Sequence, residues 1–272
     1  MRGAILLLAH SLKRVGTLVL VTGTLLAGFQ LILIVVAASI QSSGAFVQLG
    51  ELLPPFAREI LGPSLASFLS FTGIVCLGYF HLAPMGSLVA LSMALATTPT
   101  SEIESGFMDV ILARPLARHW IITRTIVVIA LSTAVLLGMM MAGTWIGLGS
   151  FAPEGVAWPS ARLVRSLAVN LGLLMLCWSG VAMAIGAASG RRSVAGGLGG
   201  LLALAAFLLD YVGRLWQRAE AVAWLSPFRY YNPFELVLGN PLPAKNLLVL
   251  GGIAAAGFAA AYVLFARRDI SH

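Results

Sequence analysis

Long apolar runs without charge alternate with short polar segments along this chain. A helix needs about 20 apolar residues to cross the hydrocarbon core of a membrane. Six runs reach or approach that length, at residues 17–40, 64–101, 125–153, 166–190, 193–209 and 246–266. None of them alternates between apolar and polar positions as a membrane β-strand does. The pattern therefore predicts an all-α membrane protein with six transmembrane helices.

The lengths of the runs determine where the predicted helices begin and end. The second run is far too long for one span, so we divide it into a lead-in, a long tilted helix and a loop that begins near Thr97. The fifth run is short and extends past Asp210. We predict a single transmembrane domain over residues 1–272, with spans at 17–40, 67–97, 122–149, 166–189, 193–212 and 246–266.

Two segments outside the spans have patterns of their own. Residues 1–14 place apolar side chains at helical spacing between basic ones, which suits a short helix in the membrane interface. The alternative is a charged flank of the first span. Residues 213–245 are rich in Trp and Tyr, which favour the headgroup region, and contain Pro227 and Pro233. We expect this second segment to be re-entrant, or to lie on the outer surface as a broken pair of helices.

Composition and charge narrow the class of protein and orient it. Hydrophobic residues make up 59% of the chain and charged residues 10%, whereas soluble domains carry about 25% charged residues. The formal charge is +7, but the basic residues lie at the ends of apolar runs, so we expect no nucleic-acid partner. With the N-terminus inside, the inner segments hold ten basic residues and the outer segments seven. Because basic residues favour the cytoplasmic side, we predict an N-in/C-in, multi-pass protein of the cell inner (plasma) membrane.

The segment between the second and third runs carries more charge than its neighbours. Three acids precede three arginines: Glu102, Glu104, Asp109, Arg114, Arg118 and Arg124. Ser101 is a candidate N-cap, and the acid three residues later would complete a capping box. Apolar residues at positions 103, 107, 110 and 111 share one helical face, and Pro115 ends the pattern. We therefore predict a short amphipathic helix at residues 100–117 rather than a solvated loop.

This charged segment resembles the cytoplasmic loop of type-2 ABC exporter permeases. The family's loop typically has an acid, Gly-Thr, a Glu, a Leu-rich turn and a Pro before Ser-Arg, and residues 104–118 here read ESGFMDVILARPLAR. Phe107 stands where the family has Thr, Asp109 where it has Glu, and Ala117 where it has Ser. Two further stretches, LSPFRYYNPFELVLG at 225–239 and FARRDI at 265–270, resemble the family's outer segment before the last span and its C-terminal ending.

The resemblance implies a division of work between subunits. Residues 100–117 would be a cytoplasmic coupling helix seated in a groove of a separate ATPase, and residues 1–14 would ride on that subunit. The implied contact residues are Glu102, Glu104, Gly106, Phe107, Asp109, Arg114, Pro115 and Arg118. Two ABC ATPase copies would bind ATP and Mg, and a second permease copy, identical or related, would complete the path. This chain contains no GxxxxGK[ST] phosphate loop, so we expect it to bind no cofactor and to be no enzyme itself.

Polar residues inside the predicted spans have several possible roles. His81 either lines a substrate path or packs as a neutral, hydrogen-bonded side chain next to Pro84. Gln30 and Asn170 are expected to form hydrogen bonds between helices, and Asp210 is expected to anchor the fifth span at the interface. We predict no metal site from the distribution of His, Cys, Asp and Glu.

Small residues and cysteines also carry expectations about packing. Gly196 and Gly200 form a GxxxG pair, and such pairs allow helices to approach closely. We expect this pair to pack within the chain rather than between subunits. Cys76 and Cys177 lie inside apolar runs, so we expect buried thiols rather than a disulfide.

Two other functions compete with ATP-driven export. A secondary transporter needs ion-binding groups near the middle of the membrane and commonly has an internal repeat, and the sequence has no mid-span carboxylate or convincing repeat. A membrane scaffold that transports nothing is the second alternative. Dependence of transport on a partner ATPase would distinguish these functions.

Overall fold

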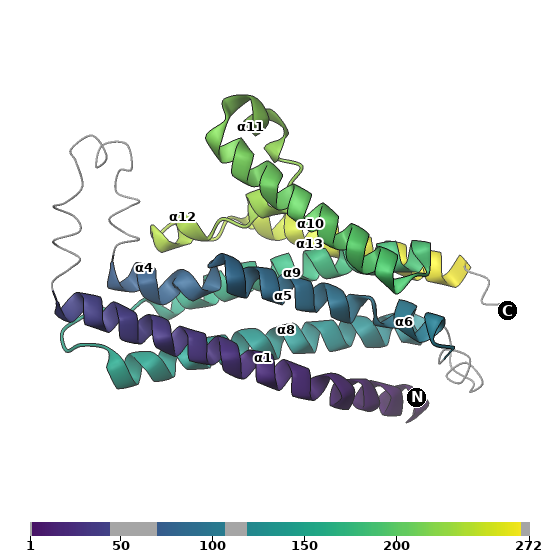
Figure 1. The fold of residues 1–272 in the computed structure, drawn as a ribbon, viewed down its shortest axis with the longest axis horizontal. Coiled ribbons are helices and arrows are strands. Elements are labelled where there is room, and N and C mark those ends of the chain that lie inside the picture. The colour runs from purple at the N-terminus through teal and green to yellow at the C-terminus, as the bar shows by residue number, and fades with distance from the viewer. Residues whose placement is uncertain (1, 44–69, 107–118, 268–272) are drawn as a thin grey trace.

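The computed structural model describes residues 2–43, 70–106 and 119–267, and the regular structure in these ranges is helical (Figure 1). The long helices are α1 (Arg2–Ser42), α5 (Leu82–Ala96), α8 (His119–Phe151), α9 (Ala161–Ser189), α10 (Arg192–Leu215) and α13 (Ala244–Arg267). The short ones are α4 (Phe71–Cys76), η1 (Leu77–Tyr79), α6 (Thr98–Glu104), α11 (Gln217–Ala223), η2 (Pro227–Tyr230) and α12 (Pro233–Val237).

Within the described residues, six helical segments are long and apolar enough to cross a membrane. They are Leu7–Ser42, Phe71–Ala96, His119–Phe151, Ala161–Ser189, Arg192–Leu215 and Ala244–Arg267. The chain is therefore a multi-pass membrane protein, as its apolar runs predict. The start of α1, the end of α13 and α6 lie at the same end of the bundle (Figure 1), as an even number of spans requires.

The first helix differs from the predicted pair of elements. Residues 1–14 and 17–40 were expected to form an interfacial helix and a separate span, but α1 runs without interruption from Arg2 to Ser42. The intervening Val15–Thr17 contains no proline and only one glycine, Gly16. One glycine costs a helix only about 1 kcal/mol, so nothing in the sequence there stops the helix.

The second span is broken where a single tilted helix over residues 67–97 was expected. After α4 and η1 the chain turns at Phe80, and α5 starts after His81. At the break, the main-chain carbonyl of Tyr79 accepts a hydrogen bond from the Tyr231 hydroxyl over 2.5 Å. The Tyr79 hydroxyl forms a second bond, with the Thr144 hydroxyl, at 3.0 Å. Interrupted helices are tolerated in membranes when protein groups satisfy the freed backbone in this way.

The segment at residues 213–245 folds back on the fifth span. Gly213 of α10 lies where a Cβ atom would meet Ala223 at the end of α11, and the Ser226 hydroxyl donates to the carbonyl of Ala206 over 2.7 Å. Pro227 and Pro233 stand in the first turns of η2 and α12, where the missing N–H of proline costs no hydrogen bond. Burial raises the pKa of the Tyr231 phenol.

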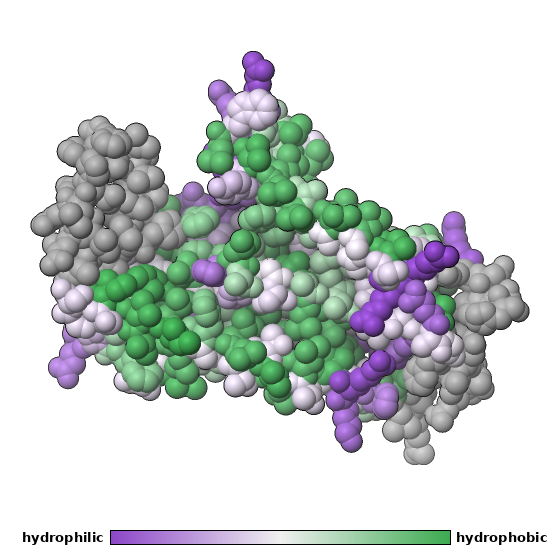
Figure 2. Space-filling model, in the orientation of Figure 1, coloured by the Kyte–Doolittle hydropathy of each residue, from purple (hydrophilic) through white to green (hydrophobic). Residues whose placement is uncertain are grey.

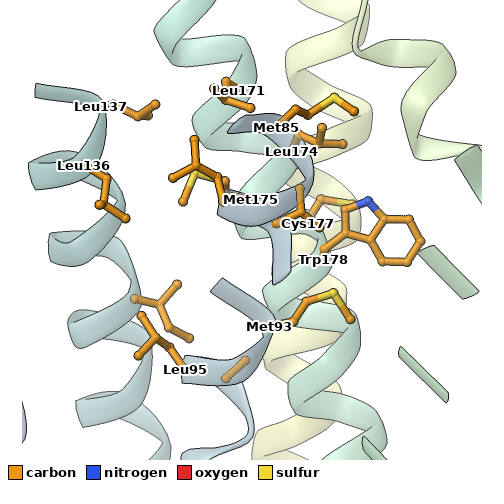
Figure 3. Close-up of a cluster of buried hydrophobic side chains, with 14 of the residues drawn as sticks. Met85, Met93, Leu95, Leu136, Leu137, Leu171, Leu174, Met175, Cys177 and Trp178 are labelled. Carbon is orange, nitrogen blue, oxygen red and sulfur yellow. The ribbon is translucent and has the colours of Figure 1, made fainter. Parts of the chain in front are cut away.

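The core lies between α5, α8, α9 and α13. Figure 3 shows apolar side chains from α5, α8 and α9 meeting, among them Met85, Met93, Leu136, Leu137, Leu171, Leu174, Met175 and Trp178. Cys76 and Cys177 are both buried and unpaired, in agreement with the expectation of packed thiols. Sulfur and aliphatic groups fill such a core without polar atoms that need partners.

Glycine contacts define the closest helix pair, but they are not at the predicted GxxxG motif. A Cβ atom on Gly257 of α13 would lie 2.4 Å from the carbonyl carbon of Gly180 on α9, whereas Gly196 and Gly200 have open space where a Cβ would be. The GxxxG pair is exposed on α10 rather than packed within the described part of the chain. Close approaches of a glycine to the backbone of another helix involve Gly180 of α9, Gly257 of α13 and Gly143 of α8, which lies against Ala27 of α1.

A matched pair of alanine substitutions on α13 tests this contact. We expect Gly257→Ala to destabilise the bundle by about 1–3 kcal/mol, because the new methyl group would collide with the α9 backbone. Gly252→Ala on the same helix meets nothing within 4 Å and is expected to stabilise it by up to about 1 kcal/mol. Unfolding of the two purified variants in detergent measures the difference, and equal stabilities would contradict the packing described.

Candidate functional site

The described part of the predicted coupling segment is α6, which starts earlier than the sequence pattern indicates. The helix begins at Thr98, with Thr97 as its N-cap and Pro99 in its first turn. Ser101 therefore lies inside the helix, and the predicted capping box between it and Glu104 does not form. Pro99 explains the difference, because proline is favoured in the first turn of a helix.

Glu102 forms a buried ion pair with the third span. Its Oε2 lies 2.5 Å from Nη2 of Arg124 on α8, and each residue is only 5% exposed. The predicted role of this acid, contact with a basic residue of another subunit, does not fit a carboxylate that is already enclosed and paired. Removing one partner of a buried pair leaves an uncompensated charge, at a typical cost of about 3–5 kcal/mol.

Glu104 is exposed and is bonded to the start of the fifth span. Its Oε1 accepts the main-chain N–H of Arg192 over 3.0 Å, and Nη1 of Arg192 donates to the Ser101 hydroxyl over 3.4 Å. The first N–H groups of a helix have no partner within the helix, and a carboxylate at that end is favoured by the helix dipole. Glu104 thus acts as an external cap for α10.

These contacts attach α6 to four spans at once. It follows α5 directly, pairs with α8 through Glu102, caps α10 through Glu104, and places Thr100 against Gly186 of α9. A Cβ atom on that glycine would lie 2.6 Å from the threonine hydroxyl oxygen. Displacement of α6 would therefore act on α5, α8, α9 and α10.

The remaining predicted contact residues follow α6. A helix over residues 100–117 was predicted, but α6 ends at Glu104. Gly106 has a φ of +69°, a left-handed conformation that favours glycine and does not continue an α-helix. The other predicted contact residues, Phe107, Asp109, Arg114, Pro115 and Arg118, lie outside the described ranges. Their predicted roles stay predictions.

His81 lies at a different place from this site. It is the N-cap of α5, and its Nδ1 accepts the main-chain N–H of Ala83 over 3.3 Å. The 15 residues of α5 separate it from α6 by about 22 Å. Its imidazole packs near the Phe29 ring at 5.7 Å. The ring accepts from the helix start instead of donating to a carbonyl freed by Pro84.

The other predicted polar residues meet different surroundings. Gln30 is buried over Gly78 at the break in the second span. The side-chain nitrogen and oxygen of Asn170 have no hydrogen-bond partner among the described residues, so the expected interhelical bond is not formed there. Asp210 is paired with Arg214 one turn later, at 2.9 Å, near the C-terminal end of α10.

Sequence reasoning missed Arg124 and Arg192 as partners inside the chain. Both were counted as basic flanks of spans, because an arginine beside an apolar run gives that signal in any membrane protein. Their partners are 22 and 88 residues away. No local pattern could have indicated these contacts.

Comparison of the chain with protein-family models and with curated proteins finds no match in either case.

Proposed function

We propose that this chain is the membrane permease subunit of an ATP-driven exporter of the type-2 ABC class. The proposal rests on the resemblance of residues 104–118, 225–239 and 265–270 to that family and on the six apolar spans. The structural observation that supports it best is the attachment of α6 to four spans. A helix that transmits force from an ATPase to the spans must be attached firmly to those spans.

In this proposal, ATP and Mg bind to two copies of a separate ATPase subunit. Closure of the ATPases pushes on the segment that starts with α6, in each of two permease copies. The ion pair of Glu102 and Arg124 transmits the push to α8, and the bond between Glu104 and Arg192 transmits it to α10. The spans then move as rigid rods, and the cargo leaves through the path between the two permeases.

The assembly itself provides the test. The full chain is purified from its own membranes in mild detergent, and proteins that remain bound are identified. We expect an ATPase with a phosphate loop, in equal number to the permease, and a rate of ATP hydrolysis that depends on the presence of the permease.

The same preparation separates the alternative functions. A secondary transporter would be active as the chain alone in vesicles with an ion gradient and no ATP. A scaffold would bind its partner without changing any rate of hydrolysis. Either result would contradict the proposed function.

A further inference from the structure

A basic groove opens at the α6 end of the bundle, between α1, α5, α6 and α8. It has a volume of about 760 Å³, within the range of small-molecule sites. Figure 2 shows hydrophilic side chains gathered at this end of the visible face, next to the apolar surface of the spans. The groove therefore has a charged mouth beside walls that would contact lipid chains.

The charged groups at the mouth are mainly arginines. Arg14, Arg124 and Arg192 line the groove together with one acid, Glu102, so the lining carries a net charge of +2 with His10 neutral. Glu102 is paired with Arg124. Arg14 and Arg192 are exposed and form no ion pair with the described residues. The carboxylate nearest to Arg192, that of Glu104, accepts its main-chain N–H, so guanidinium donors remain for a ligand.

On α1 and α8 an arginine of the lining is followed, one turn deeper in the span, by an apolar residue. On α1 the polar Arg14 lies one turn nearer the helix end than Leu18, and on α8 Arg124 lies one turn nearer the end than Val128. On α5 the apolar Leu91 faces the groove deeper in the span. Leu7 on α1 and Leu95 on α5 add apolar lining near the end of the bundle. Along α1 the groove extends from Leu7 to Leu18, or about 16 Å. A ligand that fits this order has an anionic head at the end of the bundle and an apolar chain along the spans.

We infer that this groove binds an anionic phospholipid, with its phosphate at Arg14 and Arg192 and one acyl chain against Leu18, Leu91 and Val128. The positive charge of the two arginines attracts a phosphate group, and basic pockets between spans are suited to acidic headgroups. The inference requires only that the spans lie in a membrane. It does not depend on an ATPase partner, so the chain alone is expected to bind the lipid.

Native mass spectrometry of the purified full chain tests the site. Phosphatidylglycerol and phosphatidylcholine with the same acyl chains are titrated in separate samples, with inorganic phosphate as a third arm. We expect preferential binding of phosphatidylglycerol and no comparable binding of inorganic phosphate. Equal affinity for the two lipids would overturn the role of charge, and displacement of the lipid by an equal concentration of inorganic phosphate would overturn the role of the acyl chain.

Matched arginine substitutions locate the headgroup. Arg14→Gln with Arg192→Gln is expected to weaken phosphatidylglycerol binding about 25-fold. Arg162→Gln with Arg218→Gln, the same change of charge at the other end of the bundle, is expected to leave binding unchanged. Arg14→Lys with Arg192→Lys keeps both charges and is expected to retain most of the binding, which also covers the case in which the glutamine variant does not fold.

Two outcomes would overturn the assignment of the groove to a lipid. One is unchanged phosphatidylglycerol binding in the folded glutamine variant. The other is loss of lipid binding in the lysine variant as well, because charge would then not be what the site recognises. Loss of ATPase binding in the glutamine variant with lipid binding retained would instead assign the groove to a protein partner.

Discussion

Glu102→Ala is expected to destabilise the folded chain by about 3–5 kcal/mol, because it leaves the guanidinium of Arg124 buried without its partner. The arginine is 5% exposed, so the variant would keep a largely buried charge without its partner. Unfolding of the purified protein in detergent, followed by circular dichroism, measures the loss. The spans should remain helical while α6 detaches from α8.

Two controls distinguish the buried pair from a general effect of lost charge. Glu104→Ala removes an exposed carboxylate, and we expect a loss of no more than about 1 kcal/mol. Glu102→Leu combined with Arg124→Met replaces both charges with apolar groups and should recover most of the stability. A single Glu102→Ala variant as stable as the wild type would show that the pair does not hold α6 to the bundle.

Reversal of charge at Glu104 and Asp109 is expected to separate ATP hydrolysis from movement of the spans. Glu104→Lys with Asp109→Lys places positive charge where the proposal expects basic residues of the ATPase, and like charges brought together at an interface cost several kcal/mol. The complex should still hydrolyse ATP but lose transport. Movement of the spans can be measured without a cargo by placing a cysteine on the exposed side of α5, as Ser87→Cys, and labelling its thiol with and without ATP. The difference between the two labelling rates should fall at least about tenfold in the double reversal.

The chain offers a low labelling background and a matched control for this experiment. The native thiols, Cys76 and Cys177, are buried, so labelling reports the introduced cysteine. Glu220→Lys with Glu235→Lys makes the same change of charge in α11 and α12, and coupling should be unaffected by it. Because Glu104 also caps α10, Asp109→Lys alone is measured too. Normal coupling in the double reversal would contradict the assigned role of this segment.

The spans could be predicted from the sequence because the membrane imposes their length and polarity on each run separately. The breaks could not be predicted in the same way. The second span was predicted as one tilted helix, but the chain breaks at Phe80 and His81, where the Tyr79 carbonyl accepts a hydrogen bond from Tyr231, 152 residues later. A hydrogen bond over that distance has no local signature. The continuity of α1 was missed for the opposite reason, since a change in polarity between Arg14 and Thr17 was interpreted as an end of the helix.

The charged segment between the second and third spans was likewise predicted only in part. Its position between the second and third spans followed from the apolar runs. A helix over residues 100–117 was predicted, but α6 runs only from Thr98 to Glu104. Which way its acids face could not be predicted, because a carboxylate on a short helix at the end of a bundle can face either a partner subunit or the spans. Glu102 faces the spans because α8 presents Arg124 at the same level. The side that Glu102 faces depends on how α6 packs against α8, and the spacing of residues within one segment does not predict that packing.

The central claim is that the α6 end of the bundle carries the ATPase. A photo-crosslinking amino acid is introduced at the position of Ser105, which is exposed directly after α6. In a second sample it is introduced at the position of Trp224, which is 61% exposed directly after α11. Native membranes are irradiated, and adducts are identified by mass spectrometry. We expect an ATPase adduct from position 105 and none from position 224. An ATPase adduct from position 224 alone, or none from position 105 in a complex that retains its ATPase, would contradict the account.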